Sequence, residues 1–321
     1  MPPSLLDTHY TMAVKALIGG RLIPFLGAGV NLCGRPPGVI WQHGKYLPNG
    51  TELATHLSTE FAYSAADATD LLRVSQYVAV MAGSGPLYNN LHVLLDANYP
   101  PTPLHDFFAT LPKILRDKGY PSPYQLLVMT NYDDVLERAF EANGETYDVI
   151  TYMADGQHRG KFFHRLPTGE ISLIERPNEY RDLPIELLPT VKVTRPVILK
   201  IHGAVDRSNP DWDSYVITED HYIDYLTRTE ISNLMPKPLV TALQKSHFLF
   251  LGYSLRDWNL RVILHRVWGE QKLSFKSWAV QLNSQLLDQG FWRKRDVEIF
   301  NIPLEEYITT LSDRIKALPH A

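Results

Sequence analysis

Four short segments place residues with useful chemistry directly after apolar runs, where buried strands would end. They are Gly27-Ala28-Gly29-Val30-Asn31, Thr130-Asn131-Tyr132-Asp133-Asp134, His202-Gly203-Ala204 and Gly252-Tyr253-Ser254-Leu255. Open α/β sheets bind their ligands outside the carboxyl ends of the strands. If the apolar runs are parallel strands, the four segments can therefore contribute to one site.

The first segment is a candidate phosphate-binding turn. Gly27 and Gly29 permit a tight turn and a close approach of a ligand to the backbone, whose N–H groups can cradle a diphosphate. An ordinary strand-end turn explains the two glycines equally well. The usual dinucleotide fingerprint also needs a third glycine, an immediate helix and an acid about 20 residues later. Residues 32–38 instead contain two prolines and two glycines, which predict a loop and disfavour a standard hydride-transfer dehydrogenase.

The other segments offer polar side chains that each have a simpler explanation as well. The pKa of a histidine, near neutrality, suits His202 to general-base catalysis, but a histidine in a strand-end turn can equally be satisfied by the backbone. Asp133 or Asp134 could cap the helix that follows, and Ser254 or Asp257 could cap another. Asn131 is harder to explain as a cap, because it lies between the apolar run and the acids.

The apolar runs before these segments have the length and composition of buried parallel strands. The clearest are Leu22–Leu26, Gln125–Thr130, Val197–Ile201, His247–Leu251 and Trp278–Leu282, with weaker candidates at Tyr147–Tyr152 and Val297–Phe300. Helical patterns alternate with them at Thr8–Leu17, which Asp7 would cap, and at Asp133–Glu141, Arg256–Val267 and Leu304–Ile315. This alternation predicts a doubly wound, Rossmann-like α/β fold, with a parallel sheet covered by helices on both faces.

One section interrupts the alternation. From about residue 51 to residue 118 the chain shows helical patterns and no convincing strand, with helices expected at Thr51–Tyr63, Asp67–Ala82 and Leu87–Ala97. We interpret this section as a helical insertion that forms a smaller lobe beside the sheet, within a single domain of residues 1–321. A second irregular stretch, Ala154–Thr194, predicts long loops or a small β excursion.

The composition limits the class of protein. A chain of 321 residues with a formal net charge of −4 is not built to grip nucleic acid over its whole surface. Its single cysteine, Cys33, can form neither an internal disulfide nor a multi-cysteine zinc site. The N-terminus lacks the pattern of a secretory signal, and no apolar run approaches the roughly 18 residues of a membrane span. We therefore expect a soluble, cytoplasmic protein.

Taken together and in this order, the four segments resemble the motifs of the sirtuin family. Gly27-Ala28-Gly29 is similar to its phosphate-binding turn, and Thr130-Asn131-Tyr132-Asp133 to its Thr-Gln-Asn-Ile-Asp motif, with one residue fewer between threonine and asparagine. His202-Gly203 is similar to its catalytic histidine-glycine, and Gly252-Tyr253-Ser254-Leu255 to its Gly-Thr-Ser-Leu. The resemblance covers about residues 22–282 and implies the same Rossmann-like fold.

The departures from the sirtuin pattern are also informative. Sirtuin deacylases carry a four-cysteine zinc module between the histidine and the Gly-Ser motif, whereas residues 203–251 contain no cysteine. Asn31 stands where sirtuins usually have serine, and their Pro-Asp-Phe-Arg is missing, with Arg35 as a possible stand-in. The chain is therefore more similar to the zinc-less sirtuin-like domains of bacterial anti-phage systems, which degrade NAD.

This resemblance implies an NAD glycohydrolase, with NAD as substrate, no zinc, and a linear or cyclic ADP-ribose product. Asn131 and His202 would be catalytic, and Asp133 would position the nicotinamide amide. The remaining binding residues would be Gly27, Ala28, Gly29, Asn31, Thr130, Gly252 and Ser254. Alternatives are a protein deacylase or ADP-ribosyltransferase, and a nucleotide-binding module without turnover. Homo-oligomers, HerA-like ATPases and Argonautes are the partners that the resemblance implies.

Overall fold

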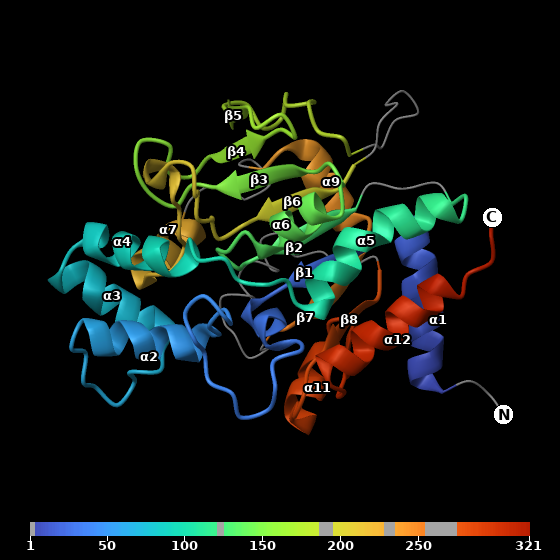
Figure 1. Cartoon of the computed structure of the whole chain (residues 1–321), viewed down its shortest axis with the longest axis horizontal. Helices are drawn as coiled ribbons and strands as arrows, with labels where there is room; N and C mark the ends of the chain where they lie inside the picture. The colour runs from blue at the N-terminus through green and yellow to red at the C-terminus, as the bar shows by residue number, and fades with distance from the viewer. Residues whose placement is uncertain (1–3, 121–124, 186–194, 228–234, 254–274) are drawn as a thin grey trace.

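The computed structural model describes residues 4–120, 125–185, 195–227, 235–253 and 275–321. Within them one sheet has the strand order β5-β4-β3-β6-β2-β1-β7-β8-β9 (Figure 1). The strands are β1 Leu22–Leu26, β2 Leu126–Met129, β3 Asp148–Tyr152, β4 Phe162–Arg165, β5 Ile171–Ile174, β6 Val197–Lys200, β7 His247–Leu251, β8 Ser277–Val280 and β9 Val297–Phe300. All seven predicted strands are confirmed, and they form the parallel part of the sheet.

Strands β4 and β5 continue the sheet in the antiparallel sense. They lie within Ala154–Thr194, so the described part of that stretch is a small β excursion rather than loop alone. The central strand β1 is buried at all five positions. A strand covered on both faces has no solvent-facing side, and this explains its uninterrupted apolar run.

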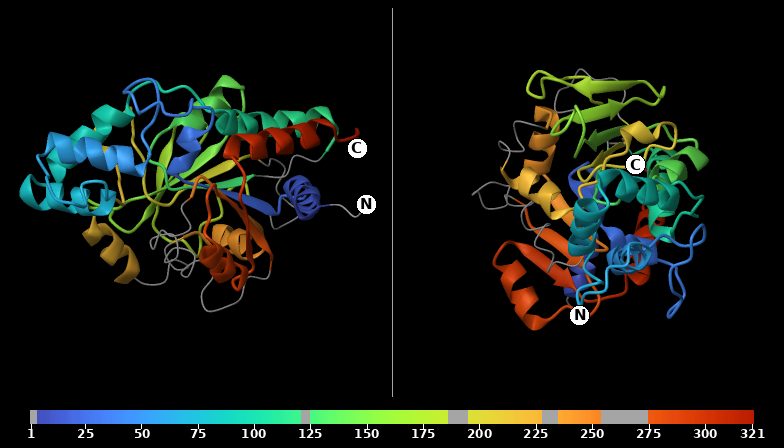
Figure 2. Two further views of the ribbon diagram at one scale, coloured as in Figure 1. Left: turned by 90° about the horizontal axis from the view of Figure 1, so that it is seen from below. Right: turned by 90° about the vertical axis from the view of Figure 1, so that its left-hand side faces the viewer.

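Helices cover both faces of the sheet, as the doubly wound fold requires (Figure 2). On one face lie α1 Leu5–Ile18, α5 Pro103–Asp117, α6 Val135–Ala142 and α12 Leu304–Lys316. On the other lie α9 Lys237–Gln244 and α11 Leu286–Arg293, together with Tyr222 of α7 Glu219–Thr227. The helix expected at Arg256–Val267 lies outside the described residues.

Helix α1 begins earlier than predicted. Its N-cap is Ser4, whose Oγ accepts a hydrogen bond of 3.0 Å from the N–H of Asp7. The prediction that Asp7 caps this helix was therefore wrong. Leu6 packs against the core, so the apolar face reaches one turn further toward the N-terminus than the pattern from Thr8 indicated. Asp7 instead lies in the first turn, where its charge complements the helix dipole.

The helical lobe consists of α2 Gly50–Glu60, α3 Leu71–Met81 and α4 Ser84–Leu95, and it lies beyond the carboxyl ends of the parallel strands (Figure 1). Its apolar residues form a core of their own, which also includes Val135, Val205 and Tyr215. Helix α5 packs on the sheet instead. The lobe is therefore shorter than the predicted insertion of residues 51–118.

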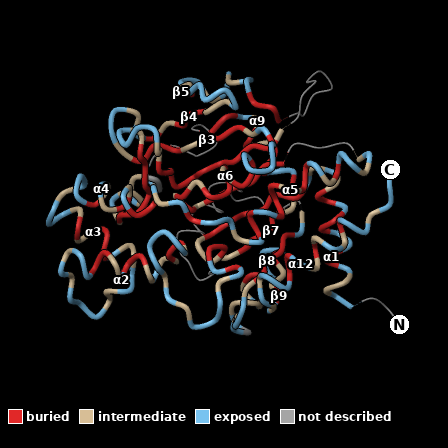
Figure 3. The backbone as a smooth tube through the Cα atoms, viewed as in Figure 1, coloured by how far each residue is buried: buried red, intermediate tan, exposed pale blue. Residues whose placement is uncertain are grey.

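Burial follows this arrangement. The strands and the inner faces of the helices are buried, whereas exposed residues line the outer faces of α2, α3 and α4 (Figure 3). Within the described ranges, no helix is long and apolar enough to cross a membrane.

Candidate functional site

A cavity of about 500 Å³ opens where the carboxyl ends of β1, β2, β6 and β7 meet the helical lobe. Its volume lies within the range of small-molecule sites, roughly 300–1,000 Å³. Eight of the predicted site residues line it: Ala28, Gly29, Asn31, Thr130, Asn131, Asp133, His202 and Gly252. Gly27 does not line the cavity, and Ser254 lies outside the described residues. Four separate strand ends thus contribute to one site, which we call the candidate site.

The turn after β1 is hydrogen-bonded to the end of β7. Gly27 N–H donates to the carbonyl oxygen of Leu251 at 3.0 Å, and Gly29 N–H donates to that of Gly252 at 2.8 Å. A Cβ atom on Gly29 would lie 2.7 Å from the Gly252 oxygen, so only glycine fits there. These bonds use two of the N–H groups expected to cradle a diphosphate. Ala28 lines the cavity, and its N–H group donates to no other described residue.

Two buried asparagines connect this turn to its neighbours. Asn131 Nδ2 donates to the carbonyl oxygen of Gly27 at 3.4 Å, which links the end of β2 to the turn after β1. Asn31 Nδ2 donates to the carbonyl oxygen of Pro48 at 3.3 Å, next to the helical lobe. Asn31 Oδ1 is buried and has no hydrogen-bond partner among the described residues. A bound molecule with a hydrogen-bond donor can satisfy it.

His202 presents a neutral ring to the cavity. Its Nε2 atom is buried without a hydrogen-bond partner in the described part of the chain, and the ring of Tyr222 lies edge-on with centroids 5.6 Å apart. Burial lowers the pKa of His202 to about 3. The near-neutral pKa expected from the sequence was therefore wrong, because desolvation disfavours the imidazolium. At pH 7 the neutral ring is able to accept a proton.

The loop that carries His202 is fixed by close packing. Gly203 has φ +86°, and a Cβ atom there would lie 2.0 Å from the carbonyl oxygen of Ser214. The carbonyl oxygen of His202 accepts a hydrogen bond of 2.8 Å from Val216 N–H. Glycine is required at this point, because both the backbone conformation and the lack of space exclude a side chain.

Asp133 bonds to the start of a helix and also belongs to the candidate site. Its Oδ1 accepts a hydrogen bond of 3.1 Å from Val135 N–H at the start of α6, and the residue also lines the cavity. Burial raises its pKa to about 6, and the charge of Lys200 opposes that shift. At pH 7 most of the carboxyl group is therefore ionised and can accept a hydrogen bond from an amide.

Several residues of the site were not predicted. Tyr253 OH donates to Thr130 Oγ1 at 2.6 Å, which bridges the ends of β7 and β2. Asn49 and Asp70, the N-caps of α2 and α3, line the cavity from the lobe. A capping signal is readable at Asn49, three residues before Glu52, but its place in the site depends on how the lobe packs.

Arg35, the possible stand-in for the sirtuin arginine, does not line the cavity. Its guanidinium group lies 2.7 Å from Glu52 Oε1, and its side chain is only 5% exposed. This ion pair ties the loop after β1 to helix α2, so Arg35 supports the lobe from outside the site. Across the described ranges, no group of three or more His, Cys, Asp or Glu residues is arranged to hold a metal ion.

Comparisons with known proteins agree with this architecture. The SIR2-like domain family matches residues 125–300. The chain is 30% identical to the NAD(+) hydrolase ThsA of Acinetobacter baumannii (strain 532279) over 259 residues, which are 79% of this chain and 40% of that protein. It is 24% identical to defense-associated sirtuin 2 of Bacillus subtilis over 279 residues, 84% of this chain and 22% of that protein. The chain thus spans less than half the length of these relatives. It belongs to the SIR2-like domain family.

Proposed function

We propose that this chain is an NAD hydrolase of anti-phage defence, which cleaves the nicotinamide–ribose bond and releases nicotinamide and ADP-ribose. The observation that carries the proposal is the candidate site itself. His202 Nε2 and Asn31 Oδ1 are buried polar atoms without partners in the described structure, and both residues line a cavity of nucleotide-binding size at the strand ends. Buried polar groups are normally hydrogen-bonded, so a polar ligand is expected there. The name of the NAD(+) hydrolase ThsA supports this substrate, and the name of defense-associated sirtuin 2 supports this role.

The bond determines what the site must do. When the bond between ribose C1′ and the nicotinamide nitrogen breaks, its electron pair neutralises the cationic ring, and the ribose gains oxocarbenium character. A water oxygen then bonds to C1′ and loses a proton. Because the water becomes strongly acidic as it bonds to C1′, even a base with a pKa of about 3, such as His202, can accept that proton.

The other residues would hold the substrate in place. We assign the N–H group of Ala28 to the diphosphate, the carboxylate of Asp133 to the nicotinamide amide, and the amide of Asn131 to the ribose or the attacking water. Asn131 already bonds to the Gly27 carbonyl oxygen, which fixes its side chain before the substrate arrives. Such preorganisation lowers the barrier, because the groups need not reorient during the reaction.

The test is to incubate the purified chain with NAD and to follow nicotinamide and ADP-ribose by chromatography, with and without an acylated lysine peptide. We expect nicotinamide release without the peptide. Release only when the peptide is present would identify a deacylase instead. NAD binding without any release would identify a nucleotide-binding module. A cyclic product would keep the bond cleavage and change the nucleophile from water to the substrate's own base.

We also propose that the chain acts as a homo-oligomer in the cytoplasm and is restrained by a partner such as a HerA-like ATPase or an Argonaute. Uncontrolled hydrolysis of free NAD would be toxic, so a control on the enzyme is required. Light scattering on the purified chain tests the oligomer. Co-purification with a candidate partner, followed by the same NAD assay, tests the restraint.

A further inference from the structure

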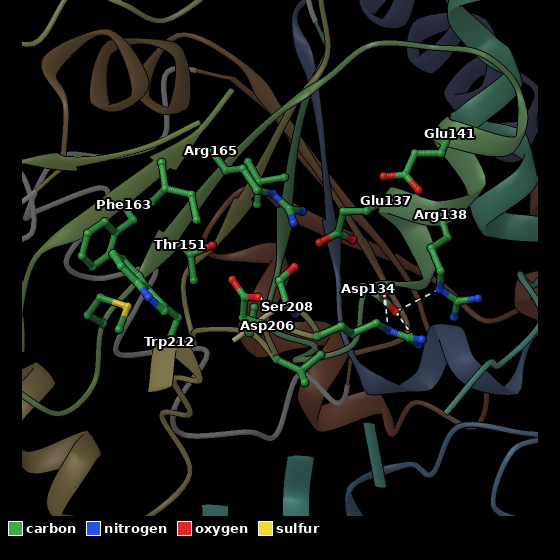
Figure 4. A pocket seen from close by; sticks show the side chains of 16 residues that line it. Asp134, Glu137, Arg138, Glu141, Thr151, Phe163, Arg165, Asp206, Ser208 and Trp212 are labelled. Atoms are coloured by element: carbon green, nitrogen blue, oxygen red, sulfur yellow. Dashed lines mark hydrogen bonds and ion pairs between the residues drawn. The ribbon is translucent and has the colours of Figure 1, made fainter. Parts of the chain in front are cut away.

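Figure 4 shows a second pocket, of about 270 Å³, whose lining includes sequence neighbours of residues that line the candidate site. Its walls are helix α6, strands β3, β4 and β5, and the loop after β6 that includes Ala204–Ser208. Two short stretches of chain lie between the two pockets. In the first, Asp133 lines the candidate site and Asp134 lines the second pocket. In the other, His202 lines the candidate site and Ala204 lines the second pocket.

One end of the second pocket is charged, and its two acidic residues differ in how many of their oxygens have partners. Asp134 pairs with Arg138 at 3.0 Å and with Arg207 at 2.7 Å. Glu137 Oε1 pairs with Lys200, but Glu137 Oε2 is buried and has no hydrogen-bond partner among the described residues. The Glu137 side chain is only 4% exposed, so bulk solvent does not hydrate that oxygen.

Arg165 on β4 faces Glu137 across this pocket. In Figure 4 the Arg165 side chain extends inward from the sheet and the Glu137 carboxylate extends inward from α6. The two groups form no ion pair with each other, and Arg165 forms none with any other described residue. The unpartnered Glu137 Oε2 and the guanidinium group of Arg165 thus belong to opposing walls of the pocket.

The other end of the pocket is apolar. The rings of Phe163 and Trp212 meet edge to face, with centroids 4.5 Å apart, and Ile171 and Met153 complete this wall. Aromatic edges and faces bind apolar groups well, and a ring or branched chain of a ligand can pack there. The second pocket is therefore charged at one end and apolar at the other, and its volume suits a small metabolite rather than a dinucleotide.

We propose that the second pocket binds a free α-amino acid with an apolar side chain and that its occupancy regulates the candidate site. The ammonium group would donate to Glu137 Oε2, the carboxylate would accept from Arg165, and the side chain would pack on Phe163 and Trp212. The two stretches of chain between the pockets carry Asp133 and His202, which belong to the proposed NAD site. A ligand in the second pocket can therefore alter the positions of these two residues. The regulatory part rests on the proposed NAD hydrolysis, whereas the binding part does not.

The binding experiment uses calorimetric titration of the full chain with leucine, isoleucine, valine, methionine, phenylalanine and tryptophan. For the tightest of these, the matching amine without the carboxylate and the matching acid without the amine are titrated next. We expect each one-headed analogue to bind at least about tenfold more weakly, because each loses a charge-assisted contact. The same loss is expected for Arg165→Met. Arg176→Met is the matched control, since its side chain is 78% exposed and lies outside the pocket.

The melting temperature of each variant confirms that it is folded. The binding proposal is overturned if no amino acid gives saturable binding, if either one-headed analogue binds as tightly as the amino acid, or if Arg165→Met binds normally. For regulation, NAD cleavage is measured with and without the saturating amino acid. We expect at least a twofold change in rate for the native chain and Arg176→Met, and none for Arg165→Met. An active chain whose rate is the same with and without the amino acid would overturn the regulatory part. A chain without any NAD cleavage would overturn the proposed function and leave the binding result intact.

Discussion

Lys200 Nζ lies 2.7 Å from Glu137 Oε1, and the two side chains are only 0% and 4% exposed. Lys200 also donates a hydrogen bond to the carbonyl oxygen of Asp133. This buried ion pair therefore connects β6, α6 and the loop after β2. It lies between the candidate site, which Asp133 lines, and the second pocket, which Glu137 lines.

Lys200→Met should destabilise the chain by about 3–5 kcal/mol, because it leaves the Glu137 carboxylate buried without its partner. Urea denaturation at pH 7 measures the loss. The double variant Lys200→Met with Glu137→Leu removes both charges and should recover most of the free energy of unfolding. A double variant as unstable as the single one would show that packing, and not the uncompensated charge, determines the effect.

The free energy of unfolding should fall as the pH drops below about 6.5, partly because of His105. This residue is completely buried, and desolvation lowers its pKa to about 3 from the ordinary 6.5. Between these values the unfolded chain binds more protons than the folded one. The stabilisation is therefore fully present above pH 6.5 and is lost as the pH falls toward 3, by about 1.4 kcal/mol per pH unit.

His105→Gln tests this dependence, because glutamine does not titrate and can keep the capping box of α5, in which His105 Nδ1 accepts from Thr102 N–H at 3.2 Å. Between pH 7 and pH 5 the variant should lose about 2 kcal/mol less than the native chain does. Urea denaturation at both pH values gives the difference. Equal losses in the two proteins would mean that His105 does not contribute.

Much of the fold could be predicted because burial on both faces leaves a direct signature. Strands β1 and β7 are almost wholly apolar, each is followed by glycine, and their bounds were predicted without error. The start of α1 was missed because the hydroxyl of Ser4 and the carboxylate of Asp7 are both good caps, and tertiary packing of Leu6 decided between them. Sequence pattern alone carries no such long-range packing information.

The candidate site was predictable where its residues adjoin strand ends. Asn131 and His202 were found because parallel strands bring their carboxyl ends to one edge. Asp70 was missed because its place in the site comes from the packing of the helical lobe. The pKa of His202 could not be predicted either, since it depends on burial by segments distant in the sequence.

Gly252→Ala should close the turn that we propose faces the diphosphate of NAD. Gly252 has φ +69°, and a Cβ atom there would lie 2.3 Å from the nitrogen of Val30. Gly169→Ala is the control, because its φ is +86° but nothing lies within 4 Å of the added atom. The control should cost roughly 1–2 kcal/mol of stability from backbone strain alone. Gly252→Ala should lower the stability by more than the control does and should also weaken NAD binding, measured by calorimetry. Equal effects of the two substitutions on stability and on NAD binding would contradict the steric argument.

The pH dependence of NAD cleavage should report Asp133. Burial raises its pKa to about 6, so the carboxylate becomes protonated below that pH and can no longer accept the hydrogen bond that we propose it forms with the nicotinamide amide. We expect kcat/KM to fall about tenfold per pH unit below 6. His202, with a pKa of about 3, stays neutral over this range and adds no second step. Asp133→Asn should lower the plateau and abolish the acid limb; an unchanged limb would assign it to another group.

Asn131 and His202 come from separate strands, β2 and β6, yet both line the candidate site. In the proposed mechanism they act on the same ribose. His202→Ala removes the proton acceptor and should lower the rate of NAD cleavage by about 10²–10⁴-fold. Asn131→Ala removes a contact to the ribose or the attacking water, and nearly complete loss of activity is expected as well. Because both groups serve one step, the double variant should be little worse than either single one.

Exposed residues of the same types provide the controls for this experiment, His320→Ala and Asn178→Ala, and both should keep full activity. Each variant is compared by nicotinamide release, melting temperature and light scattering. The two site variants should remain folded, since neither residue belongs to the hydrophobic core clusters. If a folded His202→Ala or Asn131→Ala releases nicotinamide at the native rate, that residue has no part in the reaction. If both folded variants release nicotinamide at the native rate, other groups must cleave the bond. The candidate site would then only bind a nucleotide.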